Sequence, residues 1–249
     1  MKTALITGAA RGIGLATARG LAAEGWRVAL LDRDAEALTD AVAQIDGAMR
    51  IDADVSIPAD VTRALAEVTA GFGRLDGLVN NAGVADFGPI RETSFARWRR
   101  VMETNLDGPF LMTQAFTDLL AADGGGAVVN ITSISGLRAS TLRVAYGTSK
   151  AALAQLTLQQ AVELGELGIR VNAVAPGPVA TKLAMAVHSQ DIIDAYHDAL
   201  PLNRYGSEDE IASAVIFLLG PQASFVTGQI LAADGGFEAT GIGLPSLRR

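Results

Sequence analysis

The chain has 249 residues, of which 49% are apolar, and this length predicts one large α/β domain with a full core. The formal net charge of −7 argues against nucleic acid as a partner. The chain has no cysteine, which excludes disulfides, thiol catalysis and thiolate metal sites. We expect no metal site.

No apolar run in the sequence reaches the length needed to cross a membrane, so we expect no membrane partner. The first apolar run, residues 3–7, is too short for the core of a signal peptide and predicts a buried strand. The absence of cysteine fits a reducing compartment. We therefore expect a cytoplasmic protein.

The N-terminal region predicts a β-α-β unit with a glycine turn. We expect a strand at residues 3–7, a helix at residues 15–24 and a second strand at residues 27–31. The turn between the first strand and the helix reads G-A-A-R-G-I-G, residues 8–14. A glycine cluster placed between a strand and a helix indicates a nucleotide site.

Each glycine of this turn has an expected task. Gly8 permits a tight turn, Gly12 lets a diphosphate approach the backbone, and Gly14 lets the helix lie close to the sheet. The start of the helix would then offer its unpaired N–H groups to the phosphates.

Asp32 ends the second strand, where a carboxylate can accept both ribose hydroxyls of an adenosine and would repel a 2′-phosphate. This favours NAD over NADP. Arg11 and Arg33 leave the preference open, because either side chain could reach a phosphate. A second interpretation of Asp32 is a cap for the helix that follows, but Asp34 suits that role better.

Two further strands end in candidate contacts. A third strand, residues 49–53, is followed by Asp54 and Val55, where an adenine edge could be read. A fourth strand, residues 75–79, stops at N-N-A-G, residues 80–83. The asparagines can stabilise a turn or contact a cofactor directly, and the two interpretations are compatible.

A long helix is expected over residues 94–120, with Asn105 as a polar residue among apolar ones. Such an asparagine can be a satisfied core amide, bend the helix or hold a water. The fifth strand, residues 127–132, is followed by Ser133 and Ser135. Loops at the carboxyl ends of parallel strands carry the chemistry of such sheets.

Tyr146 and Lys150 lie four residues apart, at the start of an alanine-rich helical run over residues 151–164, and would share one helix face. A phenol has an unperturbed pKa of about 10. A neighbouring ammonium favours the phenolate and lowers that pKa. The pair could therefore exchange a proton with an alcohol or a carbonyl.

The C-terminal third repeats the same alternation. We expect a sixth strand at residues 169–175, then P-G-P-V-A-T at residues 176–181, a lid over the substrate at about residues 182–205, a helix at residues 207–219 and a last strand at residues 229–232. The whole chain therefore predicts a single domain built on a doubly wound parallel sheet of the Rossmann type.

With these residues in view, the sequence resembles the short-chain dehydrogenase/reductase family, in its compact single-domain type. The resemblance rests on four motifs and covers nearly the whole chain. They are TGxxxGxG at residues 7–14, NNAG at residues 80–83, YxxxK at residues 146–150 and PGxxxT at residues 176–181.

The resemblance implies a catalytic tetrad of Asn105, Ser133, Tyr146 and Lys150. Ser133 would hold the substrate oxygen, with Ser135 close enough to serve as a control. Tyr146 would exchange the proton. Lys150 would lower the pKa of the tyrosine and hold the ribose hydroxyls, and Asn105 would position a water that links Lys150 to solvent.

The cofactor contacts implied by the turn and by the resemblance come from every motif. They are Gly8, Arg11, Gly12, Ile13, Gly14, Asp32, Asp54, Val55, Asn81, Ala82, Gly83, Tyr146, Lys150, Pro176, Gly177, Val179 and Thr181. Such proteins are commonly homotetramers, with the helices that carry Asn105 and Tyr146 at an interface.

The expected substrate is a small alcohol or ketone. Its pocket is expected to draw on Ser135, Leu137, Arg138, Thr141, Arg143, Met185, His188, Tyr196, His197 and Arg204. This mixture suggests oxidation of a sugar, sugar acid or polyol with NAD. The pattern is also similar to the NADPH-dependent 3-oxoacyl-carrier-protein reductases, and a non-catalytic NAD-binding regulatory protein is the remaining alternative.

Overall fold

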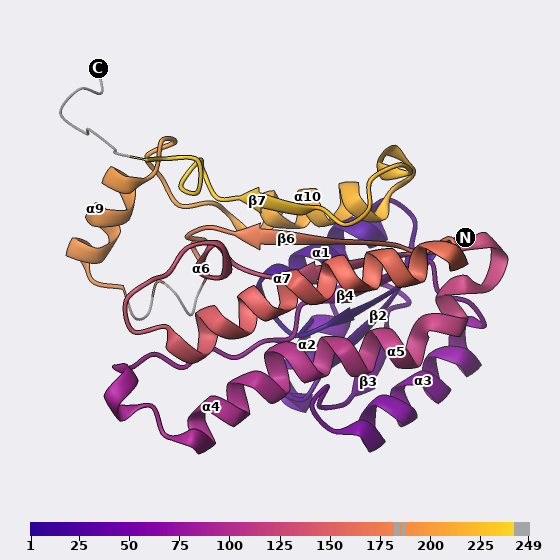
Figure 1. The fold of residues 1–249 in the computed structure, drawn as a ribbon. Coiled ribbons are helices and arrows are strands. Elements are labelled where there is room, and N and C mark those ends of the chain that lie inside the picture. The colour runs from indigo at the N-terminus through magenta and orange to yellow at the C-terminus, as the bar shows by residue number, and fades with distance from the viewer. Residues whose placement is uncertain (182–184, 186–187, 242–249) are drawn as a thin grey trace.

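A seven-stranded parallel sheet forms the centre of the protein (Figure 1), in a computed structural model that describes residues 1–181, 185 and 188–241. The strand order is β3-β2-β1-β4-β5-β6-β7. The strands are β1 (Thr3–Thr7), β2 (Arg27–Asp32), β3 (Met49–Asp52), β4 (Gly77–Asn80), β5 (Ala127–Ile131), β6 (Arg170–Pro176) and β7 (Ile230–Ala233). The predicted doubly wound sheet is confirmed, with strand ends within two residues of those expected.

Helices cover both faces of the sheet. They are α1 (Gly12–Ala23), α2 (Ala35–Val42), α3 (Pro58–Phe72), α4 (Phe95–Met102), α5 (Gly108–Ala121), α6 (Ile134–Leu137), α7 (Val144–Leu164), α9 (Gln190–Ala199) and α10 (Glu208–Leu219). Short 3₁₀ turns occur at Ile90–Glu92, Ala122–Gly124, Gly165–Leu167 and Pro221–Ala223.

Two apolar clusters, one on each face of the sheet, make up the core. One cluster joins α1, α2 and α10 to the sheet, and the other joins α3, α5 and α7 (Figure 1). Successive residues of β1 alternate between them: Ala4 and Ile6 belong to the first cluster and Leu5 to the second. This alternation follows from the two-residue period of a strand.

Local signals explain where several helices begin and end. Pro58 occupies the first turn of α3, and Gly73, with φ 71°, ends that helix in the left-handed conformation. Ser207 and Glu210 form a capping box at the start of α10. The helix expected from residue 15 begins three residues earlier, so Gly12 and Gly14 lie inside α1.

The long helix expected over residues 94–120 is interrupted. α4 passes into a π-helical turn at Glu103–Asp107 and continues as α5. Asn105 lies within this turn, which agrees with its expected ability to bend the helix. Single π turns within helices are frequent at functional sites.

The strand order reverses between β1 and β4, which creates a crevice at the carboxyl ends of these strands. β6 and β7 point toward the end of the molecule where α9 lies (Figure 1). Of the predicted lid, residues 182–184 and 186–187 lie outside the described residues. None of the helices in the described ranges is long and apolar enough to cross a membrane.

Candidate active site

Two adjoining cavities lie at the carboxyl ends of the strands. The first cavity has a volume of about 610 Å³ and the second about 310 Å³. Asn81, Gly83, Val84 and Thr181 line both. Apart from Gly14 and Asn105, every predicted site residue lines one cavity or the other.

The glycine turn forms one wall of the first cavity. Gly8 and Gly12 have φ values of 63° and 62°, a conformation that favours glycine. A Cβ atom on Gly14 would lie 2.4 Å from the carbonyl oxygen of Gly8, so the expected close packing of this residue is observed. No side chain caps the start of α1, which leaves its first N–H groups without a side-chain partner.

Asn81 fixes the turn from the opposite strand end. Its Nδ2 donates to the carbonyl oxygens of Thr7 and Gly8, both at 2.9 Å. The hydroxyl of Thr7 accepts hydrogen bonds from the backbone N–H groups of Asn81 and Ala82, both at 3.0 Å. The turn-stabilising interpretation of the N-N-A-G motif is therefore confirmed, and Thr7 is a partner that the sequence analysis missed.

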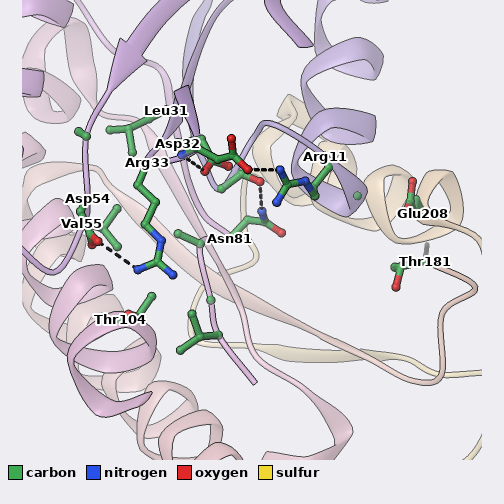
Figure 2. Close-up of a pocket in the computed structure, with 17 residues that line it drawn as sticks. Arg11, Leu31, Asp32, Arg33, Asp54, Val55, Asn81, Thr104, Thr181 and Glu208 are labelled. Atoms are coloured by element: carbon green, nitrogen blue, oxygen red, sulfur yellow. Dashed lines mark hydrogen bonds and ion pairs between the residues drawn. The ribbon is translucent and has the colours of Figure 1, made fainter. Parts of the chain in front are cut away.

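Asp32 lies at the wall of the first cavity (Figure 2). Its Oδ1 accepts the N–H of Asp34 at 3.0 Å and its Oδ2 accepts the N–H of Ala10 at 3.1 Å. Each carboxylate oxygen keeps a lone pair for a further donor. Asp34 caps α2 through the N–H of Ala37 at 3.1 Å, as expected.

Both arginines of the first cavity are paired with carboxylates (Figure 2). Arg11 hydrogen-bonds Asp34, and this bond is the main cause of the lowered pKa of Asp34. Arg33 lies 3.1 Å from Asp54. Burial alone would raise the pKa of Asp54, but hydrogen bonds from Ser56 and Arg33 bring it below its ordinary value. Both carboxylates are therefore ionised at neutral pH.

Ser133, Tyr146 and Lys150 come together in the second cavity. Ser133 is the N-cap of α6, and its hydroxyl accepts the N–H of Ser135 at 3.1 Å. The hydroxyl of Ser135 instead accepts a hydrogen bond from Arg143 at 2.9 Å, and Ser135 lines neither of the two cavities. Of the two serines, Ser133 is the one placed with Tyr146.

The expected effect of Lys150 on Tyr146 is wrong for this structure. Burial raises the pKa of the Tyr146 phenol, and a hydrogen bond with Ser133 and the charge of Arg143 offset only part of this rise. Lys150 is not among the causes. Its Nζ donates to the carbonyl oxygen of Ile131 at 2.7 Å and lies 5.9 Å from the centroid of the tyrosine ring. Burial lowers the pKa of Lys150 itself from 10.5 to about 8.

Asn105 is fully buried behind the wall that the two cavities share. Its Oδ1 accepts the N–H of Val84 at 2.8 Å, and its Nδ2 donates to the carbonyl of Val84 at 2.9 Å and to the hydroxyl of Ser149 at 3.0 Å. Asn105 thus ties the N-N-A-G loop to α7. The π turn carries the side chain that makes these contacts.

Three of the predicted substrate contacts line the second cavity: Arg143, His188 and Tyr196. The rings of His188 and Tyr196 stack with centroids 5.7 Å apart. Phe87, which the sequence analysis missed, packs edge-on against Tyr146 at 6.1 Å. No local pattern in the sequence marks Phe87, because only the course of the loop after residue 83 brings it to the site.

The other predicted substrate contacts lie outside this cavity. They are Ser135, Leu137, Arg138, Thr141, Met185, His197 and Arg204. Arg138 pairs with Glu238, and Arg204 pairs with Glu210. Within residues 1–181 and 188–241, no group of three or more histidine, aspartate or glutamate side chains could hold a metal ion.

Comparison with known proteins supplies the family. The family model described as "Enoyl-(Acyl carrier protein) reductase" matches residues 8–238. Galactitol 2-dehydrogenase (L-tagatose-forming) of Cereibacter sphaeroides is 43% identical over 239 residues, which cover 94% of each chain. The 3-oxoacyl-[acyl-carrier-protein] reductase FabG of Staphylococcus epidermidis is 36% identical, over 94% of this chain and 98% of its own.

Solved structures agree with these relatives. The crystal structure of levodione reductase superposes with a TM-score of 0.92 at 34% identity, over 96% of this chain and 98% of that chain. The glycine turn, the N-N-A-G loop and the Ser133–Tyr146–Lys150 cluster all lie within the matched region. The chain therefore belongs to the short-chain dehydrogenase/reductase family, as an NAD(P)-dependent oxidoreductase that interconverts a secondary alcohol and a ketone.

Proposed function

We propose that this protein is an NAD-dependent dehydrogenase that oxidises a secondary alcohol of a small polyol, sugar or sugar acid, with Tyr146 as its proton-transfer residue. The observation that carries the proposal is the meeting of Ser133, Tyr146 and Lys150 in a cavity that adjoins the glycine turn. The similarity to a galactitol dehydrogenase supports a polyol-like substrate.

The residues of the first cavity fit a dinucleotide. The uncapped start of α1, next to Gly8 and Gly12, can accept a diphosphate, because helix N-termini attract anions. Asp32 can accept ribose hydroxyls, and the small side chains of the N-N-A-G loop leave room beside it. When bound, the nicotinamide ring would accept the hydride that leaves the carbinol carbon. The contacts proposed for the cofactor are those expected from the sequence.

Each residue of the second cavity has a proposed task. The Ser133 hydroxyl holds the substrate oxygen, and Tyr146 removes the proton from the alcohol in its ionised form, which the charge of Arg143 favours against the effect of burial. Lys150 is a buried cation that stabilises negative charge on the oxygens in the cavity. Asn105 acts through the backbone of Val84 and through Ser149, so it is a positioning residue.

The charge of the first cavity supports NAD as the preferred cofactor. Arg11 and Arg33 are paired with Asp34 and Asp54, which offset their positive charge toward an additional phosphate. Asp32 has no arginine or lysine partner among the ion pairs of the described residues. A 2′-phosphate beside this carboxylate would be repelled.

The similarity to 3-oxoacyl-carrier-protein reductases keeps reduction of an acyl thioester as the second candidate. The volume of the second cavity, about 310 Å³, lies at the lower end of the range of ligand sites and supports the smaller substrate. We also propose a homotetramer, supported by exposed apolar side chains on α5 and α7.

The test is turnover of a panel of polyols, sugars, aldonates and 3-oxoacyl thioesters, measured as NADH or NADPH absorbance. We expect oxidation of members of the first three groups, with a higher kcat/KM for NAD than for NADP. Tyr146→Phe should lose at least about 1000-fold in kcat, since it removes proton transfer, and should keep its affinity for NAD. Full activity of Tyr146→Phe would remove the assigned role, and turnover of the thioesters alone would establish the second candidate.

A further inference from the structure

Arg143 is a cation placed beside the proposed reaction centre. It is the N-cap residue of α7 and precedes Tyr146 by three positions, so the two side chains share one face of the helix. Both line the second cavity. The charge of Arg143 also acts on Tyr146, where it favours the ionised phenol.

The partners of this guanidinium among the described residues are uncharged. Nη1 donates to the hydroxyl of Ser135 at 2.9 Å, Nη2 donates to the hydroxyl of Tyr196 at 3.1 Å, and the group lies 4.8 Å above the centroid of the Phe87 ring. Among the ion pairs of the described residues, none involves Arg143. Arg138, five residues earlier, is paired with Glu238.

The three contacts hold the guanidinium in a defined orientation without neutralising it. A guanidinium has five N–H donors in a rigid plane, so donors remain after two are used by hydroxyls. Phe87 supports its face, which is a favourable packing for arginine. The side chain is therefore oriented before any ligand arrives, which lowers the entropic cost of binding.

The rest of the second cavity, as lined by the described residues, contributes no negative charge that would offset the charge of Arg143. Its described lining residues include two basic side chains, Arg143 and Lys150, and no aspartate or glutamate. The chain as a whole, in contrast, has a net charge of −7. The other titratable side chains in the described lining are His188, Tyr146 and Tyr196, and none of them is a carboxylate.

We propose that Arg143 binds a carboxylate on the substrate, so that the enzyme acts on a hydroxy acid in preference to the neutral alcohol of the same skeleton. The planar fork of arginine matches the two oxygens of a carboxylate. This inference rests on the proposed function, because it names the substrate class of the same cavity.

The test compares matched substrate pairs that differ in one carboxylate. D-Gluconate is paired with D-glucitol, and 4-hydroxycyclohexanecarboxylate with cyclohexanol. Wild-type protein should prefer the acid of at least one pair. Arg143→Gln should lower the acid-to-neutral ratio of kcat/KM about 10- to 100-fold, mainly through KM, which is the range expected for a charged hydrogen-bonded contact. Using this ratio cancels any effect of the variant on Tyr146.

Two variants serve as controls. Arg143→Lys keeps the charge but not the fork, so it should retain part of the preference. Arg138→Gln removes an arginine that lies outside the cavity, and it should keep the wild-type ratio and the wild-type rates. An unchanged ratio in Arg143→Gln, or a wild-type preference for the neutral member of both pairs, overturns the proposal.

A binding measurement separates this inference from the proposed function. Cyclohexanecarboxylate, which has no hydroxyl to oxidise, is titrated calorimetrically into NAD-loaded wild type and Arg143→Gln, with melting curves to verify that both are folded. Weaker binding to the variant supports the carboxylate site even if no alcohol in the panel is turned over. Equal binding to both proteins, or no binding to wild type, contradicts it.

Discussion

At the scale of one residue, the buried ammonium of Lys150 lowers the stability of the folded protein. Only 4% of it is exposed, its Nζ donates to the carbonyl of Ile131, and burial lowers its pKa from 10.5 to about 8. The folded protein at neutral pH must hold this ammonium out of water. By the free energy of a pKa shift, the charge destabilises the fold by roughly 3 kcal/mol.

This cost predicts a stabilising substitution. Between pH 8 and pH 10.5 the unfolded chain binds a proton that folded Lys150 has released, so wild-type stability rises with pH through this window. Lys150→Met should be more stable than wild type at neutral pH by about 1–3 kcal/mol, after the lost hydrogen bond is counted. The difference should shrink as pH rises through the window.

Chemical denaturation of both proteins at several pH values measures this difference. Lys2→Met is the matched control, because Lys2 is exposed and loses only a cation–π contact with Trp26, so the free energy of unfolding should fall by no more than about 1 kcal/mol. Turnover should be lost in Lys150→Met only. Greater stability of the wild type at every pH would show that burial of this ammonium is not costly.

Sequence analysis could predict the site residues whose side chains belong to recognisable motifs or strand ends, and not the others. Ser133 and Tyr146 were predicted to share a site and both line the second cavity, and Asp32 lines the first. The carbonyl of Ile131 and the ring of Phe87 were not, because a backbone acceptor and a loop residue become partners only in the folded chain. The predicted lowering of the Tyr146 pKa was wrong, because the spacing of residues in the sequence does not reveal how deeply the phenol is buried.

At the scale of one element, α1 shows how glycines fix the distance between a helix and a strand end. Gly14 and Gly20 both lie in this helix. A Cβ on Gly14 would meet the backbone oxygen of Gly8 at 2.4 Å, whereas a Cβ on Gly20 would meet the terminal methyl of Ile216 at 2.5 Å. The atom that a Cβ on Gly14 would meet belongs to the backbone and cannot move without shifting the turn. The Ile216 methyl that a Cβ on Gly20 would meet can move by rotation of its side chain.

The two glycines form a matched pair of variants. Gly14→Ala should lower the free energy of unfolding by about 1–3 kcal/mol through overpacking, and it should abolish NAD binding because the glycine turn must shift. Gly20→Ala should be neutral or gain up to about 1 kcal/mol from helix propensity. Thermal melting and NAD titration measure both effects, and equal stability of the two variants would contradict this account.

Elements with strong local signals were predicted well, and those set by distant contacts were not. β1 was predicted at Thr3–Thr7 and is found there, because buried apolar runs bounded by glycine are distinctive. α6, with four residues, is too short to show a period. The π turn at Glu103–Asp107 depends on the reach of Asn105 to Val84, which lies 21 positions away in the sequence.

At the scale of the whole molecule, α5 and α7 lie next to each other on one face (Figure 1) and carry exposed apolar side chains. Phe110 is 45% exposed, Leu158 39% and Val162 76%. Leu158 and Val162 are four residues apart and share a helix face. This surface is the one we expect to be covered in the proposed homotetramer.

Light scattering of the purified protein should give the mass of a tetramer, and Val162→Glu should give a smaller species with an unchanged fold, because the charge would have to be buried at the contact. Ile57→Glu, on an exposed residue before α3, should leave the tetramer intact. A monomeric wild type, or a tetramer that tolerates Val162→Glu, would rule out this face as the contact.

The second cavity draws Phe87, Arg143, His188 and Tyr196 from loops and from α9, and none of these four belongs to either core cluster. The first cavity, in contrast, borders the glycine turn and the N-N-A-G loop, whose main chain Asn81 and Asn105 hold in place. Mutations at these four positions can therefore change the substrate preference without disturbing the apolar core. One ancestral framework of this kind could diversify into many catalysts by exchanging a handful of peripheral side chains.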